Sequence, residues 1–227
     1  MSELPSVERL RAALANAAPL DARAALLCAV LGALAVSERE LLAAAFDLAR
    51  EIGIERAALE ELLLQGTLFG GFPRTVEAFQ LLRTRWGPRA PMPAIPRPAP
   101  EPAFAAGEAL FDRIYAELAP AVRRELFELH PALAHWIAEH AYRAVLARTE
   151  LDAATRELAA VTALAASGCR RQLLSHARGA VRCGAAVEEV RAAFRLAGLF
   201  RSAANLAELE VQVERALLAV ADREREA

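Results

Sequence analysis

The feature that most constrains the fold of this chain is an internal repeat. Residues 20–53, LDARAALLCAVLGALAVSERELLAAAFDLAREIG, align without a gap on residues 151–184, LDAATRELAAVTALAASGCRRQLLSHARGAVRCG, after a shift of 131 residues. Matches of Ala and Leu carry little weight in this composition, whereas aligned Asp, Arg and Gly are harder to obtain by chance. These rarer identities are Asp21 with Asp152, Arg39 with Arg170 and Gly53 with Gly184. We therefore predict two copies of one fold within the chain.

Composition and patterning predict an all-α fold for both copies. Hydrophobic residues make up 56% of the chain and are dominated by the helix formers Ala and Leu, whereas aromatic residues make up 6%. Ser37 and Glu40 have the spacing of a capping box at the start of one helix, which Gly53 is expected to end. In the second copy, helices are predicted at about 103–118, 121–129, 131–148, 152–167, 169–183, 186–199 and 203–221.

A proline-rich segment divides the chain into two parts. Residues 87–102 read GPRAPMPAIPRPAPEP. Proline cannot continue a helix and forces the residue before it into an extended conformation. We predict that this segment is a stiff linker. It would join a first, degenerate helical repeat at residues 1–86 to a second repeat at residues 103–227, which carries the site.

Charge and hydropathy exclude several classes of function. The net charge of −2, without a basic or acidic tail, argues against a nucleic-acid-binding or membrane-surface protein. The long apolar run at residues 24–36 is too short to span a bilayer, and the first ten residues lack a signal-peptide pattern. Three cysteines suit a reducing compartment and do not form a disulfide framework. We expect a cytoplasmic protein with no nucleic-acid and no membrane partner.

The helix expected from residue 169 has two opposite stripes, given about 100° of rotation per residue. The stripe predicted to face outward contains Arg171, Ser175, Arg178 and Arg182. The stripe predicted to face inward contains Cys169, Leu173, His176, Ala180 and Cys183, with Gln172 at its edge. An imidazole and a thiol on an inward face are candidates for chemistry.

Glu157, on the preceding helix, is also predicted to point inward, toward His176. Burying an unpaired carboxylate is costly, so we expect the two side chains to pair. In the first copy Leu26 aligns with Glu157 and Ala45 with His176, so both polar groups are absent together. A carboxylate that orients an imidazole is a common acid–base device. The alternative interpretation is a purely structural pair in the core.

No metal ion and no cofactor are expected. His135 and His140 are five residues apart and do not share a helical face, whereas two metal ligands on one helix are usually three or four residues apart.

Three segments carry a resemblance to a known superfamily. They are LDAATREL from residue 151, QLLSHARGAVRCGAAVEEV at residues 172–190 and LFGGFPRTVEAF at residues 68–79. Together they resemble the carboxymuconolactone decarboxylase and alkylhydroperoxidase D superfamily, as a two-repeat member. The resemblance implies antiparallel helices, a small-molecule substrate and homo-oligomers with sites near subunit interfaces. A homotrimer is the first expectation for the assembly and a dimer the second.

The peroxidase branch of this superfamily carries the pattern Glu-x11-Cys-x2-Cys-x3-His, in which x stands for any residue. Glu157, Cys169 and His176 keep this spacing, but position 172, which holds the peroxide-attacking thiol in that branch, is Gln. Cys183 lies several turns along the same helix from Cys169 and cannot pair with it. Cys28 is expected to be a core residue. These departures argue against the two-thiol cycle.

The decarboxylase branch resembles residues 172–180 more closely. By this resemblance His176 would supply a proton, Glu157 would orient it and Gln172 would donate a hydrogen bond to an enolate-like anion. Arg74 and Arg201 are candidates for binding a substrate carboxylate, by position alone.

Three hypotheses for the function stay open. The first and favoured one is a decarboxylase-like lyase that acts on a small lactone or oxo acid. The second is a thiol peroxidase with antioxidant activity that uses Cys169. The third is a non-catalytic helical scaffold.

Overall fold

The computed structural model describes residues 6–91 and 101–226, and within these ranges it contains helices and their connections but no β-strand. The α-helices are α1 (Ser6–Ala15), α2 (Ala22–Val36), α3 (Arg39–Glu51), α4 (Arg56–Gln65), α5 (Gly71–Trp86), α6 (Glu101–Tyr115), α7 (Ala119–Leu129), α8 (Pro131–Trp136), α9 (Ala153–Ser167), α10 (Arg170–Arg182), α11 (Val187–Leu196) and α12 (Ala203–Glu226). Short 3-10 helices are η1 (Gly66–Leu68), η2 (Ala116–Leu118) and η4 (Ala197–Leu199), and η3 (Ile137–Leu146) is a π-helix. The predicted all-α fold is confirmed. None of the described helices is both long and apolar enough to cross a membrane.

The helices of the two halves begin and end at corresponding residues. The shift of 131 residues carries α2 onto α9, α3 onto α10, α4 onto α11 and η1 onto η4, with identical lengths in each pair. Both central helices also start in the same way, because Asp21 accepts a hydrogen bond from the backbone of Ala24, and Asp152 from that of Thr155. This correspondence supports the interpretation of the chain as a duplication.

The predicted capping box at Ser37 is wrong. Ser37 ends α2 in the left-handed conformation, with φ 65°, and its position in the second half is taken by Gly168, with φ 73°. The N-cap of α3 is Glu38, and no side chain caps that helix. An N-cap residue normally has an extended backbone, which Ser37 cannot adopt while it ends α2.

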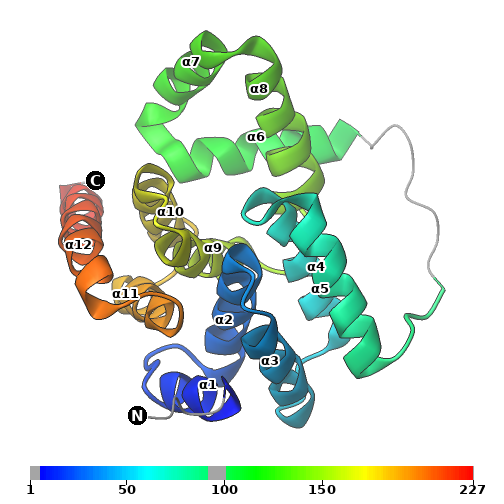
Figure 1. Cartoon of the computed structure of the whole chain (residues 1–227). Coiled ribbons are helices and arrows are strands. Elements are labelled where there is room, and N and C mark those ends of the chain that lie inside the picture. Colours follow the sequence, from blue (N-terminus) through cyan, green and yellow to red (C-terminus); the bar gives the residue numbers. More distant parts are fainter. Residues whose placement is uncertain (1–5, 92–100, 227) are drawn as a thin grey trace.

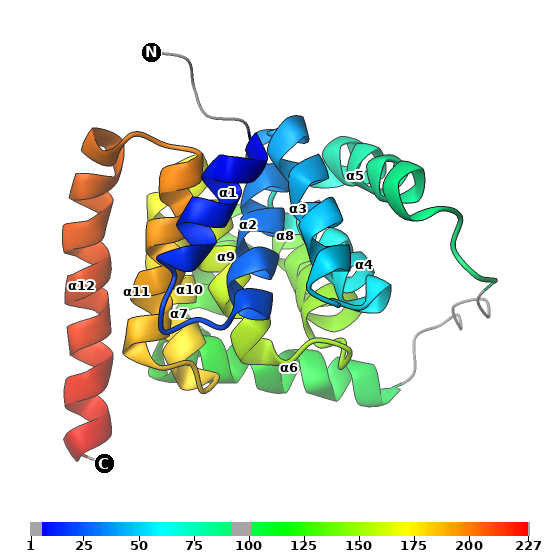
Figure 2. The same ribbon diagram turned by 90° about the horizontal axis from the view of Figure 1, so that it is seen from below.

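The two halves share one hydrophobic core. Figures 1 and 2 show α2 and α9 side by side at the centre, where they pack against each other, with α1 and α3 on one side and α10 and α11 on the other. The core cluster runs continuously from Leu10 in α1 to Leu217 in α12. The two predicted repeats therefore do not have separate cores.

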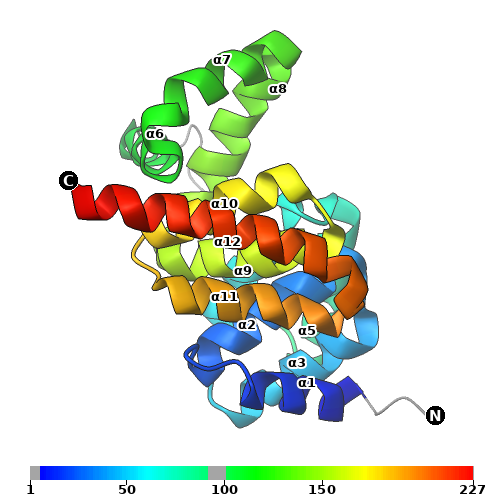
Figure 3. The same ribbon diagram turned by 90° about the vertical axis from the view of Figure 1, so that its left-hand side faces the viewer.

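The segment α6–α8 precedes the residues that align with the first half, and after the shift of 131 residues it does not fall on any described residue of that half. Figure 3 shows α6, α7 and α8 standing above α10, with α12 lying across the other side of α10. A small cluster formed by Phe111, Ile114, Ala119, Tyr142 and Leu146 joins α6 to η3. Within the predicted linker, residues 87–91 have no regular structure and α6 already begins at Glu101, whereas residues 92–100 lie outside the described residues.

Candidate functional site

Glu157 and His176 form the expected pair at the seam between α9 and α10. Nδ1 of His176 lies 2.8 Å from Oε2 of Glu157, and the two side chains are 11% and 2% exposed. Burial lowers the pKa of His176, but the charge of Glu157 and the hydrogen bond to it outweigh burial, so this pKa lies above its ordinary value. The imidazole therefore keeps its proton to a higher pH than a free histidine does, and Nδ1–H then donates to the carboxylate.

Gly179 makes room for this pair. A Cβ built on Gly179 would lie 2.6 Å from Oε2 of Glu157 and 3.0 Å from Cγ2 of Ile114. Position 179 corresponds to Leu48 in the first half, which is buried together with Leu26 and Ala45. In the first half, apolar side chains therefore fill the space that a carboxylate and an imidazole occupy in the second half.

A cavity of about 650 Å³ opens beside His176. It lies between α10 and the segment α6–α8, and η1, η3 and the end of α9 complete its wall. Phe69 of η1 contacts the imidazole edge-on, with ring centroids 5.9 Å apart. Because Nδ1 is bound to Glu157, Nε2 is the ring nitrogen left for a molecule in this cavity.

Two tyrosines of the cavity wall hydrogen-bond to each other. Burial raises the pKa of both Tyr115 and Tyr142, and the negative charge of Glu157 raises both further. Their hydrogen bond lowers the pKa of Tyr115 and raises that of Tyr142.

Cys169 does not lie on an inward face, contrary to the prediction. It is exposed at the N-cap of α10 and, like the exposed Gln172, it borders the cavity. The prediction assumed that the helix already includes residue 169, whereas α10 begins at Arg170 and the N-cap has a non-helical backbone.

The other two cysteines are less exposed, since Cys28 is buried and Cys183 is partly buried. Cys28 is buried as predicted, and burial raises the pKa of its thiol to about 12. Burial, followed by the charge of Glu157, raises the pKa of Cys183 to about 12 as well. All three cysteines are free thiols. Cys169 is therefore the most exposed of the three cysteines.

Arg74 and Arg201 lie away from the cavity, so the structure does not bring these two predicted substrate-binding residues to His176. Arg74 donates to the carbonyl oxygen of Ala35, near the C-terminal end of α2. The guanidinium of Arg201 occupies the space above Gly168, the C-cap of α9. A cation near the C-terminal end of a helix interacts favourably with the helix dipole. Both arginines therefore have a structural role that requires no substrate.

Arg178 was predicted to face outward but lines the cavity. The stripe that contains it would meet solvent if α10 were the outer layer. Instead, α6 packs against α10 and α7 borders the same cavity, so the stripe forms part of the cavity wall. The sequence pattern contains no signal for this cover, because helical periodicity does not show which distant element packs on a face.

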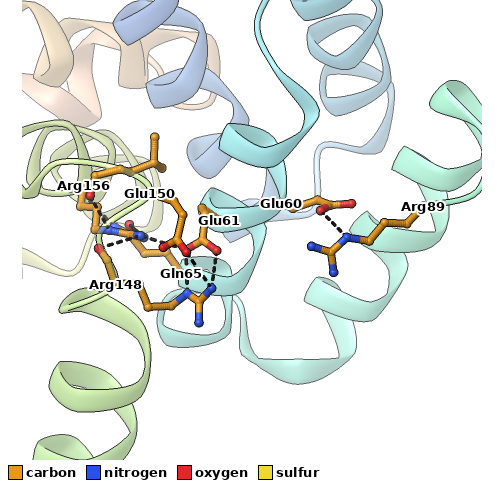
Figure 4. Close-up of polar contacts among 8 residues, drawn as sticks. Glu60, Glu61, Gln65, Arg89, Arg148, Glu150 and Arg156 are labelled. Carbon is orange, nitrogen blue, oxygen red and sulfur yellow. Dashed lines mark hydrogen bonds and ion pairs between the residues drawn. The ribbon is translucent and has the colours of Figure 1, made fainter. Parts of the chain in front are cut away.

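A buried ion cluster, shown in Figure 4, anchors the start of α9 through Arg156, which directly precedes Glu157 in the sequence. The guanidinium of Arg156 donates to Glu61 of α4 at 3.0 Å, and Arg148 donates twice to the same carboxylate, at 2.6 and 2.7 Å. Gln65 donates to the backbone oxygen of Arg156. Burial raises the pKa of Glu61, but its bonds to Arg148 and Arg156 lower it more. No sequence pattern predicts this cluster, because its partners are far apart in the chain.

The described part of the chain contains no group of three or more His, Cys, Asp or Glu side chains arranged to hold a metal ion.

Residues 131–221 match the model of the carboxymuconolactone decarboxylase family. The match runs from α8 into α12 and includes Glu157, Cys169, Gln172 and His176. No curated protein matches the chain.

Proposed function

We propose that this chain, whose residues 131–221 match the model of the carboxymuconolactone decarboxylase family, is an acid–base enzyme that decarboxylates an oxo acid or a related lactone. One observation carries the proposal. Glu157 holds the imidazole of His176 by Nδ1 and leaves Nε2 toward a largely apolar cavity. A protonated imidazole beside a largely apolar cavity is a suitable proton donor.

The proposed reaction has two steps. The bond between the substrate carbon and its carboxylate breaks, carbon dioxide leaves, and the electron pair stays on the substrate as an enolate. Nε2–H of His176 then gives its proton to the enolate carbon, and solvent returns a proton to the imidazole. Tyr115, whose raised pKa keeps the hydroxyl protonated, donates to the enolate oxygen. Gln172 at the rim is a second donor.

Replacing His176 by Asn tests this function, because Asn keeps a polar side chain at the seam but has no titratable proton. Release of carbon dioxide from a panel of lactones and oxo acids would be measured for both proteins. We expect a turnover loss of about 10²–10⁴-fold, the usual contribution of a positioned general acid. Turnover that survives the substitution would remove His176 from the mechanism.

A thiol peroxidase is the second candidate, and the exposure of Cys169 beside the cavity supports it. Here the thiolate would attack a peroxide, form a sulfenic acid and release an alcohol or water. Intact mass after graded hydrogen peroxide, compared between wild type and Cys169→Ser, tests this candidate. Rapid oxidation at low peroxide that disappears in the variant would favour the peroxidase over the decarboxylase.

We also propose that the chain forms a homotrimer, with a dimer as the second choice. Exposed apolar side chains that support an interface include Phe72, Phe127 and Trp136. The mass in solution, measured by light scattering, decides between these assemblies and a monomer.

A further inference from the structure

Three arginines of α10 line the cavity, and two of them have acidic partners across it. Arg171 binds Glu125 of α7 with N–O distances of 2.5 and 2.6 Å. Arg182 donates to the backbone oxygen of Ile114 at 2.7 Å and lies 3.6 Å from Glu117. Each of these two arginines therefore ties α10 to the segment α6–α8.

Arg178 lies between them in the sequence of α10 and differs from both. It is half-buried, lines the cavity, and makes no hydrogen bond or ion pair with any residue that the structure describes. Burial lowers the pKa of this guanidinium, and the positive charge of Arg182 lowers it further. A partly desolvated cation beside a second cation is unfavourable unless an anion is bound there.

The remainder of the cavity wall is mostly apolar. Its apolar side chains come chiefly from the segment α6–α8 and η3, among them Leu118, Val122, Leu126, Leu129, Ile137 and Leu146. The volume of about 650 Å³ lies within the range of about 300–1,000 Å³ typical of ligand sites that enclose drug-sized molecules. A very small acid would leave most of this apolar surface uncovered.

We propose that Arg178 is the anion-binding residue of the cavity and that the substrate is an amphiphilic carboxylate. Its carboxylate pairs with the guanidinium of Arg178, and its apolar body lies against the wall formed by α6, α7 and η3. This inference rests on the proposed acid–base function and narrows its substrate to an oxo acid or lactone acid with a bulky apolar body. His176 and Arg178 both line this cavity, so a molecule that fills it meets both side chains.

The test compares two probes of similar size and different charge, 4-phenylbutyrate and 4-phenylbutan-1-ol, by isothermal titration calorimetry. Wild type should bind the carboxylate at least tenfold more tightly, because hydrogen bonds to charged groups contribute about 1.5–3 kcal/mol. Arg178→Met should lose this preference. Arg171→Met, the matched control on the same helix and the same cavity, should retain it.

Arg178→Lys keeps the charge without the planar fork and should keep part of the preference. Thermal unfolding shows whether Arg178→Met folds. If it does not, Arg178→Lys takes its place in the test. Failure of the carboxylate to bind wild type, equal binding of both probes, or an unchanged preference in both Arg178 variants would overturn the proposal. This experiment measures binding and not turnover. Its result is therefore independent of whether the His176→Asn assay supports the acid–base function.

Discussion

Gly179 and Glu157 lie so close that a Cβ on residue 179 would meet the carboxylate oxygen at 2.6 Å. The seam between α9 and α10 therefore accepts the carboxylate only because residue 179 has no side chain. The same position holds Leu48 in the first half, where no carboxylate is present.

Replacing Gly179 by Ala should displace Glu157 from His176. Alanine favours a helix over glycine by about 1 kcal/mol, but crowding in a packed interior costs about 1–3 kcal/mol. We expect a net loss of stability in urea unfolding and a lower pKa of His176. Gly198→Ala is the matched control, since nothing lies within 4 Å of a Cβ built there. Equal effects of the two substitutions would argue against the close fit.

The pair should also make stability depend on pH in a defined direction. The folded-state pKa of His176 is raised above its ordinary value of 6.5, so the stabilisation is fully present below 6.5 and is lost as pH rises through the raised pKa. Each pKa unit corresponds to about 1.4 kcal/mol. The free energy of unfolding of wild type, relative to Glu157→Gln, should fall over this range. A difference that is constant or rises with pH would contradict the pairing.

Giving the second half the three apolar side chains that the first half has at these positions should abolish turnover without lowering stability. The triple variant Glu157→Leu, His176→Ala, Gly179→Leu introduces the side chains of Leu26, Ala45 and Leu48. A buried ion pair replaced by well-packed apolar residues is often neutral or stabilising, so we expect unchanged or higher stability without turnover. His176→Ala alone leaves a buried carboxylate unpaired and should cost about 3–5 kcal/mol. Turnover by the triple variant would rule out the proposed mechanism.

Two neighbouring glutamates of α4 provide a test of the buried ion cluster. Both are 6% exposed, but Glu61 binds the buried Arg156, whereas Glu60 binds Arg56 and Arg89, which reach solvent (Figure 4). Glu61→Gln leaves a buried cation without a carboxylate and should cost about 3–5 kcal/mol. Glu60→Gln should cost less, about 0–1 kcal/mol. Chemical unfolding of both variants measures the difference, and similar losses would contradict a special role for Glu61.

Much of the fold and the central pair could be predicted from the sequence for a simple physical reason. Helical periodicity fixes which side chains share a face, and a second copy without Glu157 and His176 marks them as a unit. Periodicity does not reveal what packs on that face, so Arg178 was assigned to solvent and the cover by α6 and α7 was not foreseen. The partners Arg156 and Glu61 lie far apart in the sequence and belong to different halves, so local patterns could not connect them.

The proton on His176 is central to the proposed mechanism, and NMR titration of its imidazole measures it directly. The chain has four histidines, so the His176 signal can be assigned by its loss in His176→Asn. The mechanism predicts a pKa above 6.5 in wild type and a lower pKa in Glu157→Gln, where burial acts without the carboxylate charge. A wild-type pKa at or below 6.5, unchanged in Glu157→Gln, would contradict the role of Glu157 and of a protonated His176.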